Sequence, residues 1–241
     1  MESTVLTGLD ITGFIKFVLD NHTTLSIIIV CMAKEAFLEQ FMISVLQADE
    51  DKPDDDETHH ASVRDISEGL LQQPSLRLLA TSQTVKLVFC PEISHLRAYL
   101  SVFPPHTSQI AQEATERFNA RGQRSVLAIL NLLEAHRPTS AFSAQGLSRT
   151  FSLAVEAAHR TGSRLIIAEC VTKPEDVQAA DPPEDVTELG TATSQANPWE
   201  EEVSILNVTT KSFGAGGRGW VGRTVKLRHI AERWCRYEAV S

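Results

Sequence analysis

Short apolar runs alternate along the chain with segments whose apolar residues recur at helical spacing. The runs LSIIIVCMA, TVKLVFCP, RSVLAILNLLEAH and SRLIIAECV each predict a buried strand. The amphipathic segments predict helices at residues 10–20, in the second part of 25–46, and at 92–103, 108–122 and 140–162. Ser143 is the expected first cap of the last helix and Gly162 its stop. Helices alternating with fully apolar strands indicate a parallel sheet that is covered on both faces.

The C-terminal part of the chain has a different pattern. The segments EVSILNVTTKSF and GRTVKLRHIAERWCRYEAV read as two or three strands joined by the turn GAGGRGW, with no helix between them. The predicted fold class is therefore α/β: a mainly parallel sheet flanked by helices, with a C-terminal antiparallel β-hairpin. A chain of 241 residues with 42% hydrophobic residues is long enough for one such core, so a single domain over residues 1–241 is expected.

Hydropathy and the spacing of the cysteines argue against a membrane protein and against a zinc-binding protein. The longest apolar run, from Leu25 to Ala33, falls far short of the roughly 20 residues that span a bilayer, and no basic segment precedes it as in a signal peptide. No membrane contact is therefore expected. The four cysteines form no C-x-x-C pair, which argues against a structural zinc site and favours a reduced, intracellular compartment.

Charge is strongly segregated along the chain, although the formal net charge is only −9. Residues 49–62 and 172–202 contain most of the acidic surplus, and both are expected to be mobile loops. The C-terminal end is basic instead. Its candidate nucleic-acid-binding residues are Lys211, Arg218, Trp220, Arg223, Lys226 and Arg228.

These basic residues suit a groove for single-stranded nucleic acid. On a strand, Lys226 and Arg228 share one face, and glycines around Arg218 allow the backbone to approach a phosphate while Trp220 stacks on a base. The alternative is a solvated hairpin whose positive charges balance the acidic loops of the same molecule or of a partner.

Three strand ends carry the residues by which the chain resembles a known family. The turn from Cys31 to Ala36 joins the first predicted strand to its helix and contains no glycine. The run VLAILN ends in Asn131, and in LIIAECV the apolar run is followed by Glu169 and Cys170. In order of elements the chain resembles RecA-like ATPase domains, where these places hold a phosphate loop, a metal-associated aspartate and an Asn-Gln pair. The diagnostic residues are replaced in all three, so the resemblance implies a chain without ATP hydrolysis and without a bound cofactor.

The combination of this scaffold with degenerate motifs is similar to the ATPase-dead recombinase paralogues of the Shu-complex kind. That resemblance implies a non-catalytic accessory subunit, located in the nucleus or alternatively the cytoplasm, which supports homologous recombination and DNA repair. Its partners would be RecA-like subunits in a hetero-oligomer, and single-stranded DNA. The chain is also similar to the RecA-like subunits of the Elongator complex, which implies a structural role in tRNA modification as the alternative.

A third interpretation is an enzyme that uses strand-end cysteines. Cys31, Cys90 and Cys170 each close a predicted strand, so parallel pairing would place all three at the carboxyl edge of the sheet, with Glu169 or His95 to assist a nucleophile or a metal. Free cysteines are, however, commonly buried as small apolar side chains. No H-x-x-x-H or G-x-S-x-G motif supports a metal site or a hydrolase.

Overall fold

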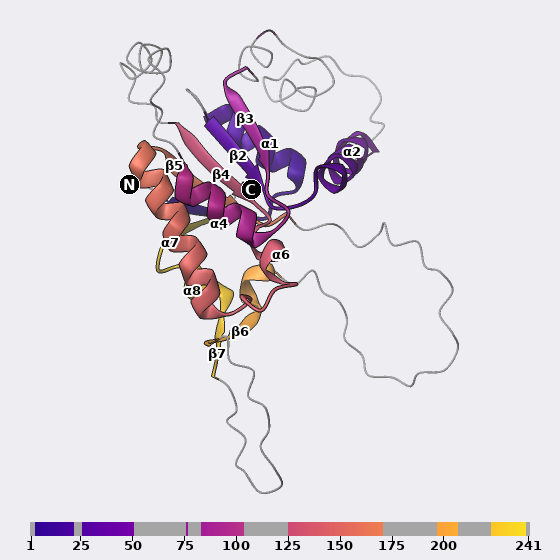
Figure 1. Ribbon diagram of the computed structural model, residues 1–241. Helices are drawn as coiled ribbons and strands as arrows, with labels where there is room; N and C mark the ends of the chain where they lie inside the picture. Colours follow the sequence, from indigo (N-terminus) through magenta and orange to yellow (C-terminus); the bar gives the residue numbers. More distant parts are fainter. Residues whose placement is uncertain are drawn as a thin grey trace, which may run out of the picture.

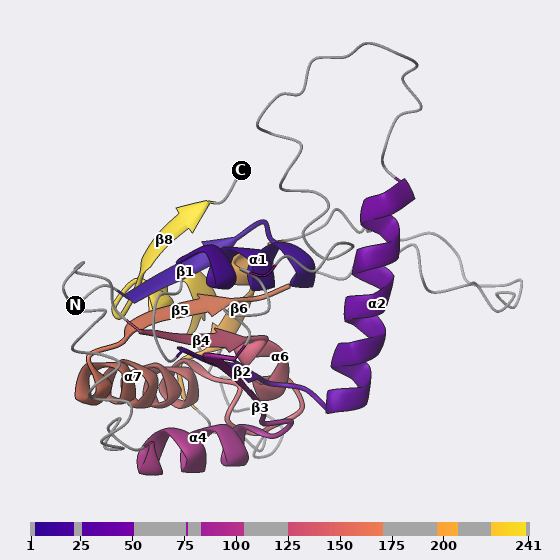
Figure 2. The same ribbon diagram turned by 90° about the horizontal axis from the view of Figure 1, so that it is seen from above.

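Six parallel strands form the central sheet of the protein in the computed structural model, which describes residues 3–21, 26–50, 76, 83–103, 125–170, 197–206 and 223–239 (Figure 1). The strands are β1 (Ser3–Thr7), β2 (Ser26–Val30), β3 (Val85–Phe89), β4 (Val126–Leu130), β5 (Arg164–Ala168) and β8 (Arg236–Ala239). Their order is β3-β2-β4-β5-β1-β8, which can be followed across the sheet in Figure 2. The predicted α/β class with a mainly parallel sheet is confirmed.

Apolar side chains on successive strand positions divide the core into two layers, because neighbouring residues of a strand point to opposite faces. Ile29, Leu127 and Ile167 pack in one layer. Ile28, Ala128 and Ile166 pack in the other. All five residues of β4 are buried, as expected for a central strand covered on both sides.

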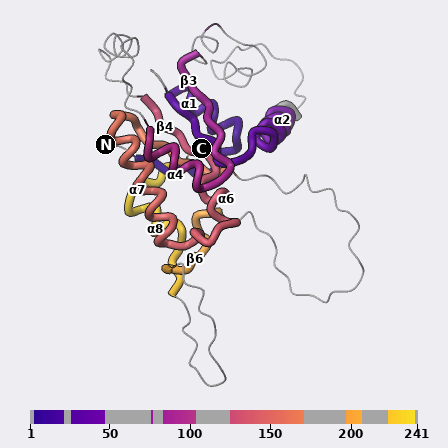
Figure 3. The backbone as a smooth tube through the Cα atoms, viewed as in Figure 1, coloured from indigo at the N-terminus to yellow at the C-terminus, as the bar shows by residue number. Residues whose placement is uncertain are grey.

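The helices lie on both faces of this sheet. Helix α1 (Ile11–Asn21) and the start of α2 (Lys34–Glu50) belong to the layer that contains Ile28. The opposite layer includes buried residues of α4 (Ile93–Val102), α6 (Leu132–His136), α7 (Ala144–Thr161) and α8 (Leu227–Ala231). Helices α4 and α7 lie side by side (Figure 3). The predicted ends of α7 are confirmed: Ser143 accepts a hydrogen bond from the Gly146 N–H at 3.2 Å, and Gly162 is left-handed with φ 66.

Two elements differ from the sequence prediction. Strand β1 was not predicted, although it lies between β5 and β8 in the sheet. At the C-terminus, β6 (Glu202–Ser204) and β7 (Thr224–Lys226) form the predicted antiparallel pair. The prediction of a helix-free end is wrong, because α8 follows β7 and leads to β8, which pairs in parallel with β1. Leu227, Ile230 and Ala231 have helical spacing and bury one side of α8.

The predicted acidic loops fall mostly outside the described residues, as does the predicted helix at 108–122. The structure describes only the ends of these two segments: α2 continues to Glu50, and Pro198–Glu200 forms a short 3-10 helix, η2, directly before β6. Trp199 of η2 is only 1% exposed and anchors this segment. Among the described helices, none has the length and apolar character required to cross a bilayer.

Candidate functional site

The turn between β1 and α1 joins a central strand to a helix, which is the structural context of a phosphate loop. Its sequence from Gly8 to Gly13 keeps the G-x-x-x-x-G spacing, and Gly8 has the positive φ of 84 that glycine adopts without strain. A phosphate loop continues with Lys and then Ser or Thr. Here Phe14 and Ile15 stand at those two positions.

This turn also lies where ligands of open α/β sheets usually bind. Helix α1 follows β1 and packs on one face of the sheet. In open α/β sheets ligands usually bind outside the carboxyl ends of the strands, and this turn lies at the carboxyl end of β1. The turn Cys31–Ala36, which the resemblance places at the phosphate-loop position, joins the next strand, β2, to α2.

Phe14 fills the core instead of reaching toward a ligand. Its side chain is fully buried and belongs to the same apolar cluster as Leu6 and Ile166. A lysine at this position of a phosphate loop reaches the outer phosphates, which requires a side chain that points out of the core. Phe14 therefore has neither the positive charge nor the outward orientation of a phosphate-binding lysine.

A carboxylate of the chain itself occupies the N-terminal end of α1. The Gly13 N–H donates to Asp10 Oδ1 at 2.8 Å, and the Phe14 N–H donates to the Asp10 backbone oxygen at 3.0 Å. The Ser44 hydroxyl, from α2, donates to Asp10 Oδ2. The Asp10 carboxylate thus already accepts one N–H group at the start of α1, and a phosphate approaching this end of the helix would meet a like charge.

Asn131 stands at the carboxyl end of β4, where the resemblance expects a metal-associated aspartate. It is 4% exposed, and its backbone is left-handed with φ 59. Its side-chain oxygen accepts a hydrogen bond from the Cys170 N–H at 2.9 Å, and its own N–H donates to the Ala168 oxygen at 2.9 Å. The side chain ties β4 to the end of β5 and has no charge to offer a metal ion.

Glu169, at the end of β5, is a buried carboxyl group that accepts a backbone hydrogen bond. Its Oε1 accepts from the Leu133 N–H at 2.7 Å, at the start of α6. Burial raises the pKa of Glu169 to about 8, against the opposing effect of that hydrogen bond. Much of this group is consequently neutral near pH 7, which suits a structural contact to α6 better than metal ligation.

The thiols at the strand ends favour the protonated form, whereas a nucleophilic cysteine acts as the thiolate. Cys31 and Cys90 are buried. The residues directly before them, Val30 and Phe89, lie opposite each other in the pairing of β2 with β3. Cys170 follows β5, which is separated from β2 by β4, so the three thiols do not form one group at adjacent strand ends. Burial raises the pKa of Cys31, Cys90 and Cys170, whereas reactive cysteines have lowered pKa values. In the ranges that the structure describes, no group of three or more His, Cys, Asp or Glu side chains is placed to hold a metal ion.

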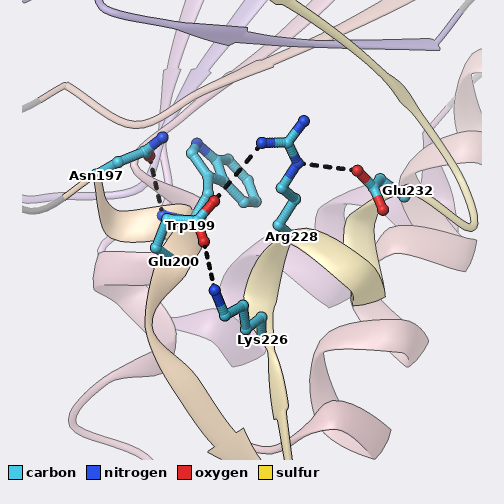
Figure 4. Close-up of polar contacts among 6 residues, drawn as sticks. All are labelled: Asn197, Trp199, Glu200, Lys226, Arg228 and Glu232. Carbon is cyan, nitrogen blue, oxygen red and sulfur yellow. Dashed lines mark hydrogen bonds and ion pairs between the residues drawn. The ribbon is translucent and has the colours of Figure 1, made fainter.

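The C-terminal cations form a cluster with nearby carboxylates (Figure 4). Lys226 Nζ lies 2.9 Å from Glu200 Oε2, and Arg228 Nη1 lies 3.6 Å from Glu200 Oε1. Arg228 Nε also lies 2.9 Å from Glu232 Oε1. The Arg228 guanidinium carbon is 5.1 Å from the centre of the Tyr237 ring, where a cation is attracted to the aromatic face.

The prediction that Lys226 and Arg228 share one face of a strand is wrong, since Lys226 ends β7 and Arg228 belongs to α8. Their side chains nevertheless converge on Glu200 because η2 lies beside both elements. Trp199 holds η2 in place through an edge-on contact with Tyr237, with ring centres 5.6 Å apart. The basic end is therefore partly neutralised by the end of the acidic segment, in agreement with the alternative interpretation of the charges.

Not every predicted cation is paired. Residues 197–206 and 223–239 contain five carboxylates and five Lys or Arg side chains, so this part of the surface is formally neutral. Arg223 is exposed, and the ion pairs found among the described residues do not include it. Lys211, Arg218 and Trp220 lie outside the described residues.

Two features of the sequence mark the β1–α1 turn and the carboxylate partners of the basic C-terminal residues, which were not predicted. The spacing of Gly8 and Gly13 marks the strand-to-helix turn, and it follows the short apolar stretch of β1. The run of three glutamates at 200–202, next to a tryptophan, marks the partners of the basic end, although its distance in sequence from Lys226 conceals the contact.

Comparison with known proteins identifies the family. The chain belongs to the SPAC22G7.03-like family, whose model matches residues 3–197. This range begins with β1 and includes the β1–α1 turn, Asn131 and Glu169. A search of the curated proteins found no match to the chain.

Proposed function

We propose that this protein is a non-catalytic, RecA-like accessory subunit of a multiprotein complex that supports homologous recombination and DNA repair. The observation that carries the proposal is the β1–α1 turn, which keeps the glycine spacing of a phosphate loop while Phe14 and Ile15 replace its lysine and its hydroxyl residue. A scaffold that retains the frame of a nucleotide site without its chemistry fits a protein that works by association.

Three contacts support the absence of nucleotide chemistry in particular. Phe14 is in the core, Asp10 accepts a hydrogen bond from the Gly13 N–H at the start of α1, and Asn131 accepts one from the Cys170 N–H. ATP hydrolysis relies on backbone N–H groups and a lysine around the phosphates and on a carboxylate that helps to hold Mg²⁺. At the described β1–α1 turn and at the end of β4, the lysine and the carboxylate are replaced by Phe14 and Asn131.

The proposed partners are RecA-like subunits that together form a hetero-oligomer in the nucleus. A subunit without its own nucleotide site contributes by stabilising or positioning others, and a neighbour with an intact site would then supply ATP hydrolysis. The expected companions are therefore chains whose first strand-to-helix turn keeps the lysine that is missing here.

We assign the contact to single-stranded DNA to the C-terminal region: Lys211, Arg218, Trp220, Arg223, Lys226 and Arg228. The ion pairs of Lys226 and Arg228 are exposed to solvent, and exposed ion pairs contribute little to stability. These cations can therefore exchange a carboxylate for a DNA phosphate at little cost. The neutral balance of the surface predicts modest affinity for this subunit alone.

Purification at native expression level tests the proposal. The protein is tagged at its own locus and isolated gently, and stoichiometric companions are identified by mass spectrometry. Recombinase or RecA-like repair subunits with intact phosphate loops are the expected result. Companions that modify tRNA would instead assign the chain to an Elongator-type assembly, and a protein with no stable companion would contradict an accessory role.

A further inference from the structure

Helix α2 exposes a stripe of large apolar side chains. Leu38 is 43% exposed, Met42 63% and Leu46 62%. Residues four apart lie on the same side of a helix, so these three form one continuous stripe along most of α2. Apolar side chains gathered in this way on a surface helix usually mark a contact with another protein surface.

The other side of α2 holds the helix to the rest of the protein. Phe37 is buried and packs edge-on against Phe89, with ring centres 5.6 Å apart. Further along, the hydroxyl groups of Ser44 and Thr12 lie 2.6 Å apart and join α2 to α1. Figure 2 shows α2 standing at one side of the sheet, apart from α4 and α7. A helix that has apolar residues on its exposed side, as well as on the side packed against its own protein, is expected to bury the exposed side against another surface.

We propose that the apolar stripe of α2 binds the same stripe of a second copy of this chain, with the two helices antiparallel. Helix α2 runs from Lys34 to Glu50, and Met42 is at its midpoint. An antiparallel pair centred on Met42 places Met42 against its own counterpart. Leu38 of each copy then faces Leu46 of the other, so the stripe is complementary to itself about a two-fold axis.

Charge favours the same arrangement. Lys34 is an exposed cation in the first turn of α2, at the end where the partial charge of the helix dipole is positive and a cation is unfavourable. Antiparallel pairing brings Lys34 beside the carboxyl end of the partner helix, where the partial charge is negative, and it also aligns the two dipoles favourably. A single pair of helices buries less than the ~1,600 Å² of a standard interface, so the dimer is weak and depends on concentration.

Sedimentation velocity over a range of concentrations tests the proposal on the full chain. The wild type is expected to shift from monomer toward dimer as concentration rises. Met42→Lys places two cations together on the two-fold axis and is expected to weaken association at least tenfold. The control is Val102→Lys, which changes a 76% exposed apolar residue of α4 and should leave association unchanged. A wild type that stays monomeric throughout, or a dimer that Met42→Lys leaves intact, would overturn the proposal.

A charge exchange tests the antiparallel register. Leu38→Glu and Leu46→Lys should each weaken the dimer when introduced singly, because a charge then faces a leucine. In the double variant, each introduced carboxylate faces an introduced ammonium group across the interface, and association should recover. Parallel pairing would instead place like charges together and deepen the loss. Circular dichroism of every variant verifies that the fold is kept, and failure of the folded double variant to recover would refute the proposed register.

Discussion

The side-chain oxygen of Asn131 accepts a hydrogen bond from the backbone N–H of Cys170 at 2.9 Å. This contact joins the carboxyl ends of β4 and β5. Asn131 therefore has a structural role at the position where the resemblance to RecA-like ATPases expects an aspartate. It also has a left-handed backbone, with φ 59, which asparagine tolerates better than most residues.

Asn131→Ala is expected to lower the free energy of unfolding by roughly 2–4 kcal/mol, because it leaves the Cys170 N–H without its acceptor and forces alanine into a left-handed backbone. Asn131→Gly loses the same hydrogen bond but adopts the backbone without strain, so its loss should be about 1–2 kcal/mol smaller. Urea denaturation of both variants measures the difference. Equal stability of the two variants would show that the backbone conformation is not under strain.

Phe14→Ala is expected to lower the free energy of unfolding by roughly 3–5 kcal/mol, because it leaves a cavity beneath the sheet where a phosphate loop would have a solvent-directed lysine. The matched control in the same helix is Asp20→Ala, whose exposed side chain should contribute less than about 0.5 kcal/mol. Chemical denaturation compares both with the wild type. A nearly neutral Phe14→Ala would mean that the side chain is not part of the core.

Glu169 makes stability depend on pH. The pKa of its buried carboxyl group is raised to about 8 in the folded protein, from an ordinary value of 4.5, so the folded state holds this proton more tightly than the unfolded state. Its contribution to stability is fully present below pH 4.5 and is lost as the pH rises through 8. Glu169→Gln keeps an oxygen acceptor for the Leu133 N–H and removes the ionisation.

The melting temperature of Glu169→Gln relative to the wild type should therefore rise between pH 5 and pH 9, because only the wild type loses stability as its buried carboxyl group ionises. Glu156→Gln is the control, since Glu156 is exposed on α7 and is not among the groups that shift the pKa of Glu169. Thermal unfolding across this range provides the measurement. A constant difference between variant and wild type would contradict a buried, ionisable Glu169.

Glu200 pairs with both Lys226 and Arg228, so Glu200→Gln should free Lys226 and leave Arg228 with Glu232 as its remaining ion-pair partner in this cluster. The variant is expected to bind single-stranded DNA roughly 2–10 times more tightly than the wild type, with a steeper dependence on salt. Glu35→Gln removes one negative charge from α2, away from this cluster, and controls for net charge. Fluorescence anisotropy at several salt concentrations gives both quantities. Equal gains in the two variants would count against a DNA contact at the C-terminal cations.

The sequence predicted the elements whose patterns are long and local. The runs of β2, β4 and β5 and the amphipathic α7, with its caps at Ser143 and Gly162, are visible without tertiary information. Strand β1 was missed because only Val5 and Leu6 form its apolar centre, and its burial comes from pairing with β5 and β8. Because β1 was not predicted, the glycine spacing of Gly8–Gly13 could not be recognised as part of a strand-to-helix turn.

The candidate charged surface could be predicted only in part. The positions of Lys226 and Arg228 were apparent, but their partner Glu200 is far away in the sequence and reaches them through the packing of Trp199. The short helix α8 was read as a strand because five residues give little periodicity. Long-range pairing of charges depends on the tertiary fold and leaves no local pattern.

Nucleotide binding by the purified full chain tests the central claim most directly. Isothermal titration with Mg²⁺–ATP and Mg²⁺–ADP, together with an assay of phosphate release, measures binding and hydrolysis without a partner. Because Phe14 and Ile15 stand where a phosphate loop has its lysine and its hydroxyl residue, we expect neither binding nor hydrolysis at millimolar nucleotide. Saturable ATP binding, or hydrolysis that Lys34→Ala abolishes, would contradict a non-catalytic subunit.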